Sequence, residues 1–191
     1  MVRDPSVGYT AFSYKTVMQP RGYEPGSVTR FLAEDHRRLE HLLQTALASA
    51  DHVVQGTYDH FRAGLLRHIG MEEKILLPAV QRWNGGRPLS IAAKLRLDHG
   101  ALAALLMPTP TTDIIGTIHR ILEQHNLAEE GPDGWYEICD RLAGAEADQL
   151  MTRLRATPEV AVLPHSDTAA VLSAVHRALE RAGHTLGSGS R

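Results

Sequence analysis

Six residues of metal-ligating type form a repeated pattern on helix-like apolar stripes. In chain order they are His36, His68, Glu72, His99, His125 and Glu129. His68 and Glu72 are spaced i, i+4, as are His125 and Glu129, so both side chains of each pair leave a helix on one face. Because an isolated buried carboxylate costs several kcal/mol, six such groups facing a core need compensation. Imidazoles and carboxylates in this arrangement predict a site for two metal ions.

Each of these residues also has an ordinary interpretation. A single histidine on an apolar stripe is more often a core imidazole bonded to a carbonyl than a metal ligand, but six residues in register reverse that expectation. For Glu72 and Glu129 the alternative is an exposed acid, which requires the helix phase to be wrong by about half a turn. Glu73 and Glu130 are the natural exposed residues instead.

Several neighbouring residues are weaker candidates. Glu40 lies i+4 from His36 and is interpreted as an acceptor for a ligand imidazole N–H, as an extra ligand, or as solvent-exposed. Asp35 and Asp98 each precede a histidine of the pattern and point about 100° away, so we expect them at the surface or behind a ligand. For the two tyrosines that could supply a phenolate, ordinary core packing is expected. They are Tyr58 and Tyr136.

Composition narrows the function classes. The chain has 191 residues and a formal net charge of −2, with no run of lysine or arginine, so nucleic acid is not an expected partner. One domain with a substantial core is the expected size class. Cys139 is the single cysteine, which excludes an intramolecular disulfide and leaves nitrogen and oxygen as the metal ligands.

The chain shows no segment typical of targeting or membrane insertion. The first 26 residues lack the apolar run of a secretory signal, and no stretch approaches the ~18 apolar residues of a membrane span. We therefore expect a cytoplasmic protein that does not bind membranes. A homo-oligomer or an unknown protein partner stays possible.

Helical periodicity dominates the chain, and strand alternation is not seen. A cap at Ser27 or Thr29 is expected to open the first helix, and the helices of the pattern run over about 27–46, 58–80, 90–106 and 114–130. Short connections favour an all-α, up-down-up-down four-helix bundle. With a helix rise of about 1.5 Å per residue, the first three histidines are expected at similar heights along the bundle axis. The same count places the fourth helix lower.

The predicted organisation has four parts. An irregular N-terminal arm covers 1–26, the metal-binding bundle 27–131, accessory C-terminal helices packed on the bundle 132–186, and a loose tail 187–191. Within the accessory part, 156–164 is a linker, and Asp167 or Thr168 is expected to cap the last helix.

The four motifs in order resemble the hemerythrin-like family, also called the HHE cation-binding domain. The resemblance is carried by Glu34-Asp-His-Arg-Arg-Leu-Glu, Leu66-Arg-His-Ile-Gly-Met-Glu-Glu-Lys, Leu97-Asp-His and Glu123-Gln-His-Asn-Leu-Ala-Glu-Glu, and it spans about 31–130. It implies two non-haem irons with an oxo or hydroxo bridge inside a four-helix bundle. It also implies that Glu72 and Glu129 bridge the irons and that the four histidines are terminal ligands. Zinc or manganese is less expected.

Two departures from the family pattern bear on function. Oxygen-carrying hemerythrins have a further histidine near the third-helix one, where this chain has Leu95 and Ala103. Ligand counting then leaves about two open positions on the irons, which favours peroxide or nitric oxide chemistry over oxygen carriage. In addition, Gly131-Pro-Asp-Gly directly follows the fourth motif, so Glu130 could replace or supplement Glu129.

Three functions are therefore expected candidates. The first is a di-iron protein that reacts with a small oxidant, with peroxide decomposition ahead of NO or O2. The second is an O2- or iron-responsive sensing module without turnover, in which the C-terminal helices report metal occupancy. The third is a zinc-bound or metal-free scaffold.

Overall fold

The computed structural model describes residues 26–47 and 53–187, and every regular element in those ranges is helical. All but residue 26 of the predicted arm at 1–26, and all but residue 187 of the predicted tail at 187–191, lie outside the described residues. The helical elements are α1 (Ser27–Ala46), α2 (Gln55–Met71), the π-helix η1 (Glu72–Leu76), α3 (Leu77–Trp83), α4 (Ala92–Leu105), α5 (Thr112–Glu130), α6 (Trp135–Ala143), the 3-10 helix η2 (Gly144–Glu146), α7 (Ala147–Arg155) and α8 (Ala169–Ala182).

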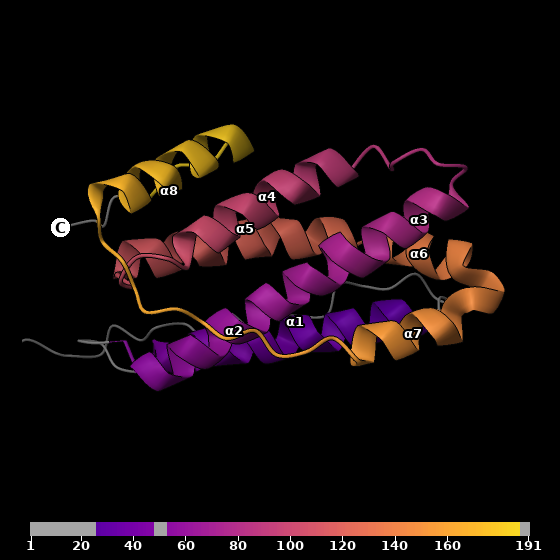
Figure 1. The fold of residues 1–191 in the computed structure, drawn as a ribbon, viewed down its shortest axis with the longest axis horizontal. Coiled ribbons are helices and arrows are strands. Elements are labelled where there is room, and N and C mark those ends of the chain that lie inside the picture. The colour runs from indigo at the N-terminus through magenta and orange to yellow at the C-terminus, as the bar shows by residue number, and fades with distance from the viewer. Residues whose placement is uncertain (1–25, 48–52, 188–191) are drawn as a thin grey trace, which may run out of the picture.

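Four helical rods run alternately up and down the molecule (Figure 1). The rods are α1, the continuous run from α2 through η1 to α3, α4, and α5. Short loops join rods that lie side by side, which forces antiparallel neighbours. The predicted all-α, up-down-up-down bundle with additional C-terminal helices is confirmed.

The second rod is one helix that changes its winding near Pro78. The sequence pattern predicted a helix over about 58–80, whereas the structure inserts the π-helical segment η1 before α3. Pro78 has no N–H, and its ring would clash with the carbonyl oxygen of Lys74 in a regular α-helix. A π-turn just before the proline widens the helix there, and such turns often occur at functional sites.

A polar layer divides the core of the bundle into two apolar clusters. One cluster surrounds Phe61, Leu102 and Ile118, and the other surrounds Leu32 and Trp135. The buried polar residues between the clusters include the six residues of the predicted metal site, with Glu72 and Glu129 fully buried. A bundle of this size would otherwise place aliphatic side chains at these positions.

The C-terminal helices pack on the outside of the bundle. Figure 1 shows α6 and α7 at one end and α8 beside α4. Asp140 of α6 supplies the cap of α1, because its carboxylate accepts hydrogen bonds from the backbone N–H groups of Val28 and Thr29 at 3.0 and 3.1 Å. The predicted cap by Ser27 or Thr29 is therefore wrong: a carboxylate from a distant helix satisfies the free N–H groups and complements the helix dipole.

Of the two residues predicted to cap the last helix, Thr168 does so and Asp167 does not. Thr168 is the N-cap of α8 and accepts from the N–H of Val171, while Asp167 binds the backbone and hydroxyl of Thr109 instead. Residues 157–168 have no regular secondary structure and include most of the predicted linker at 156–164. Within the part of the chain that the structure describes, no helix is long and apolar enough to cross a membrane.

Candidate metal centre

The four histidines meet in two pairs at the middle of the bundle. In the first histidine pair, His36 of α1 and His68 of α2 place their Nε2 atoms 2.9 Å apart. In the second histidine pair, His99 of α4 and His125 of α5 place theirs 3.0 Å apart. The fourth helix thus reaches the same height as the third, in contrast to the height count made from the sequence.

Each of the two buried glutamates extends from one histidine pair to the other. Glu72 places Oε1 3.6 Å from Nε2 of His68 and Oε2 3.0 Å from Nε2 of His99. Glu129 places Oε1 3.1 Å from Nε2 of His125 and Oε2 3.3 Å from Nε2 of His36. Each carboxylate could therefore contact two cations, one at either histidine pair.

The remaining ring nitrogen of each histidine faces a further carboxylate. The Nδ1 partners and distances are Glu130 for His36 at 2.5 Å, Asp35 for His68 at 2.9 Å, Glu73 for His99 at 2.7 Å and Asp98 for His125 at 3.5 Å. A carboxylate behind Nδ1 favours a proton on that atom, which leaves the Nε2 lone pair free for a metal. With Nε2 unprotonated, all four lone pairs would face the centre.

The geometry and the unmet bonding needs of these atoms fit metal ions. Two ligands that meet at a right angle on a metal, with bonds of about 2.1 Å, lie about 3.0 Å apart, as the Nε2 atoms of each pair do. Oε2 of Glu72 is buried, and its nearest nitrogen, Nε2 of His99 at 3.0 Å, is not aligned for a hydrogen bond. A buried anionic oxygen without a donor is costly, and a coordinated cation would remove that cost.

The protonation of the site without metal follows from the same contacts. Burial on its own lowers the pKa of His68, but the charge of Glu72 and the hydrogen bond to Asp35 raise the pKa to about 10. Burial likewise lowers the pKa of His125, which Glu129 and Asp98 raise to about 10. Although burial raises the pKa of Glu72, His68 and His99 hold it well below its usual value. In the absence of metal, protonated histidines therefore balance the charge of the ionised carboxylates.

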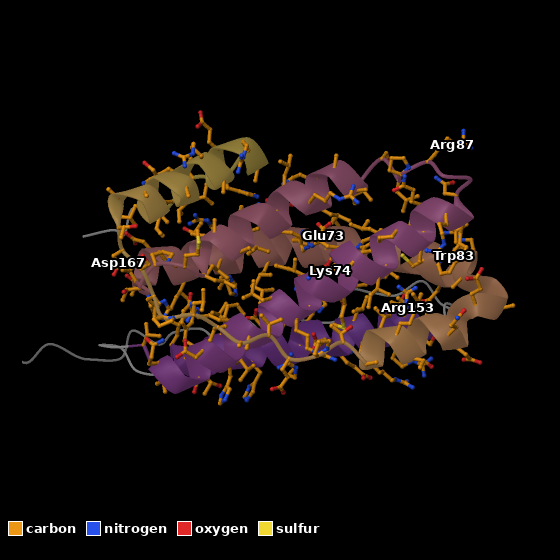
Figure 2. All side chains as sticks on the ribbon, in the orientation of Figure 1. Glu73, Lys74, Trp83, Arg87, Arg153 and Asp167 are labelled. Atoms are coloured by element: carbon orange, nitrogen blue, oxygen red, sulfur yellow. The ribbon has the colours of Figure 1, made fainter. Side chains whose placement is uncertain are left out.

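The π-helical segment lets two consecutive glutamates serve one histidine. Glu72 faces Nε2 of His99 from inside the bundle, and Glu73 faces Nδ1 of the same ring from outside. Figure 2 shows Glu73 midway along the bundle. Arg96 holds the other oxygen of Glu73 at 3.2 Å, so the supporting carboxylate is itself fixed. The widened turn thus supplies both a candidate ligand and its support.

The structure brings all six predicted ligands together and separates the additional candidates. Glu130 contacts Nδ1 of His36 and supports the ring from outside, while Glu129 occupies the centre. Glu40 lies away from the cluster, bonded to Gln44 and paired with His119. Its predicted role as a partner of His36 is therefore not seen.

Two aromatic residues, which the sequence pattern assigned to core packing, reach the centre. The hydroxyl of Tyr136 contacts both glutamates, and the indole N–H of Trp135 donates to Oε1 of Glu129 at 3.0 Å. Burial and the charges of Glu129 and Glu72 raise the pKa of Tyr136 well above its ordinary value. Trp135 and Tyr136 directly follow the Gly131–Gly134 turn, and so short a turn returns the chain to the end of α5. This was the sequence signal that could have placed them at the site.

Comparison with protein families agrees with this geometry. Residues 27–132, more than half of the chain, match the profile of the Hemerythrin HHE cation binding domain. The chain belongs to this family. Searches among curated proteins and among solved structures found no match. As a hemerythrin HHE domain, the bundle is a cation-binding unit, and the clustered histidines and glutamates are consistent with its metal site.

Proposed function

We propose that this hemerythrin-family chain binds two non-haem iron ions and decomposes hydrogen peroxide. The observation that carries the proposal is the pair of glutamates, each with one oxygen at either histidine pair. Two imidazoles and two shared carboxylates per cation form a nitrogen and oxygen ligand set that suits iron. Zinc and manganese accept similar ligands and are the alternatives that metal analysis must exclude.

The bound ions would supply the redox chemistry, in which one peroxide is oxidised to O2 with loss of two protons and two electrons and a second takes up both to give two waters. The chain's own residues hold the ligands in place. Carboxylates hydrogen-bonded to Nδ1 hold the rings of His36, His68 and His99, and Asp98 lies 3.5 Å from Nδ1 of His125. The N–H of Trp135 holds Glu129, and the phenol oxygen of Tyr136 contacts both glutamates. The apolar clusters on both sides restrict water, which strengthens these charged contacts.

Oxygen evolution from peroxide tests this proposal. Protein loaded with two irons is expected to evolve one O2 for every two peroxides consumed, and His99→Ala should abolish that activity because it removes a ligand. His60→Ala is the matched control, since His60 is exposed on α2. A protein that holds two irons and leaves peroxide unchanged would overturn the proposal.

A sensing role is the second candidate, and one contact favours it. His184, just after α8, places Nε2 2.8 Å from Oδ1 of Asp98, whose other oxygen faces His125. The C-terminal segment is thus two contacts from the metal centre. If metal occupancy is reported through this path, amide hydrogen exchange in α8 should slow on iron loading, and His184→Ala should remove the difference. Identical exchange with and without iron would eliminate this candidate.

A further inference from the structure

The phenol oxygen of Tyr136 lies among the ligand atoms of the first histidine pair. It is 2.5 Å from Oε1 of Glu72, 3.1 Å from Oε2 of Glu129, 3.2 Å from Nε2 of His36 and 3.3 Å from Nε2 of His68. The side chain is fully buried. These separations are close to the roughly 3.0 Å expected between adjacent ligands of one metal ion with bonds of about 2.1 Å.

Without a metal ion, protons hold these atoms together. The phenol has one proton to donate, and the closest contact assigns it to Glu72. Nε2 of His36 and Nε2 of His68 lie 2.9 Å apart, close enough to share a proton, and Oε2 of Glu129 lies 3.3 Å from Nε2 of His36. A cation among these atoms would take the place of those protons and bind the phenol oxygen together with the imidazole and carboxylate atoms.

The chain is folded so that this oxygen is held in place. Gly134 permits a very tight turn out of α5, since a Cβ there would lie 2.3 Å from the carbonyl oxygen of Glu129. The other end of α6 is tied to α1 through the contacts of Asp140 with Val28 and Thr29. The helix that carries Tyr136 is therefore anchored to two rods of the bundle, on both sides of the tyrosine.

Among the described residues, no tyrosine other than Tyr136 has a hydroxyl contact with either histidine pair, since the hydroxyl of Tyr58 has no hydrogen-bond partner. The second pair groups with Glu72 and Glu129. The first pair has Glu129 at 3.3 Å from His36, Glu72 at 3.6 Å from His68, and Tyr136 in addition. The two halves of the site are thus chemically different, although their histidines and glutamates are arranged alike.

We infer that Tyr136 is a fifth protein ligand of the metal ion held by His36 and His68. This inference rests on the proposed two-iron site and adds to it. On coordination the phenol O–H bond breaks, an oxygen–metal bond forms, and the proton passes to water, with no electron transferred. The ion at the first pair is then more fully coordinated by protein, and a small reactant meets the ion at the second pair.

The visible spectrum of the ferric protein tests the inference. A phenolate bound to ferric iron gives a charge-transfer band in the visible range and resonance-enhanced ring vibrations, which imidazole and carboxylate ligands do not give. Full-length protein loaded with two ferric ions is expected to show both signals. Tyr136→Phe should bind two irons and lose both. Tyr58→Phe is the matched control, because Tyr58 is equally buried in the apolar cluster around Phe61 and its hydroxyl has no hydrogen-bond partner.

The outcomes separate this inference from the proposed function. A wild-type protein that holds two ferric ions and lacks the phenolate vibrations overturns the inference whether or not the variant folds, and leaves the two-iron proposal standing. Signals that survive Tyr136→Phe overturn it as well. Phenolate vibrations in a protein that leaves peroxide intact would support the inference while removing the peroxide activity. A protein that binds no iron removes both.

Discussion

At the scale of single residues, each histidine of the site uses both ring nitrogens. Nδ1 faces a carboxylate and Nε2 faces the centre, and this holds for all four rings. Hydrogen bonds from Nδ1 fix the rings of His36, His68 and His99 before a metal arrives, which lowers the ordering cost of binding. The carboxylates behind the rings are as informative about function as the ligands themselves.

Removing the charge behind one ring should weaken metal binding. In Asp35→Asn the amide can no longer attract the Nδ1 proton of His68 as strongly, so we expect iron affinity to fall by about 10- to 100-fold. Competition with a chelator of known affinity measures this. Glu40→Gln is the control on the same helix, since Glu40 lies away from the cluster. Equal affinities for both variants would contradict the supporting role of Asp35.

The metal-free protein should lose stability as pH rises above neutral. The pKa of His68 and of His125 is raised to about 10 in the folded state, against about 6.5 in an unfolded chain. Between these values the folded state binds more protons, so the free energy of unfolding falls with increasing pH. Denaturant titrations of metal-free protein at pH 7 and pH 10 check this.

Iron-loaded protein is the control for that pH dependence, because coordinated imidazoles carry no proton on Nε2. Its stability should change much less over the same range. A metal-free protein whose stability stays constant or rises between pH 7 and pH 10 would contradict the protonation described for the two histidines.

At the scale of elements, the sequence predicted the stripes and left Asp35 and Asp98 either at the surface or behind a ligand, without saying which ring each would face. The six candidate ligands could be found because they occupy apolar-stripe positions on four successive helices. Asp35 points away from the stripe of α1, yet it reaches His68 on the neighbouring helix, which a helix considered by itself cannot reveal. Similarly, a count of rise per residue does not continue through the irregular connection from Met107 to Thr111.

Tyr136 illustrates a second limit of prediction from sequence. Its helix lies beyond the four motifs, and only the geometry of the turn from Gly131 to Gly134 determines where the side chain points. The sequence signal of that turn is clear, since glycine and proline mark a chain reversal. The direction in which α6 leaves the turn depends on tertiary contacts, including the cap that Asp140 gives to α1.

A side chain at Gly134 should widen the turn between α5 and α6 and displace α6. Gly134→Ala places a Cβ 2.3 Å from the carbonyl oxygen of Glu129, so we expect a destabilisation of roughly 1 to 3 kcal/mol. Gly116→Ala on α5 is the control. It meets nothing within 4 Å and should stabilise the helix by about 0.5 to 1 kcal/mol. Denaturant unfolding compares the two variants, and a neutral Gly134→Ala would show that α6 tolerates a wider turn.

At the scale of the whole molecule, the candidate ligands join all four rods of the bundle. Each histidine pair links two helices, and each glutamate links the two pairs. A cation that binds the folded arrangement and not the unfolded chain stabilises every rod together. Metal binding and the integrity of the bundle are therefore coupled.

Removing the metal should lower the melting temperature of the whole bundle. At free iron about 1,000-fold above the dissociation constant, binding adds about 4 kcal/mol, which corresponds to a rise of roughly 10 °C for a chain of this size. Thermal unfolding of iron-loaded and chelator-treated protein measures the difference. The double variant His99→Ala with His125→Ala should show little shift, and a wild-type protein that melts at one temperature in both states would contradict the coupling.

The polar layer between the two apolar clusters has a consequence for design. If all six central histidines and glutamates were replaced by leucine or methionine, the clusters would merge into one uninterrupted hydrophobic interior. Buried charged groups exchanged for apolar ones of similar volume often leave a protein as stable or more so, by about 1 to 4 kcal/mol. Such an inert bundle would unfold at a higher temperature than the natural metal-free form. The central residues therefore lower the stability of the fold in exchange for a metal site.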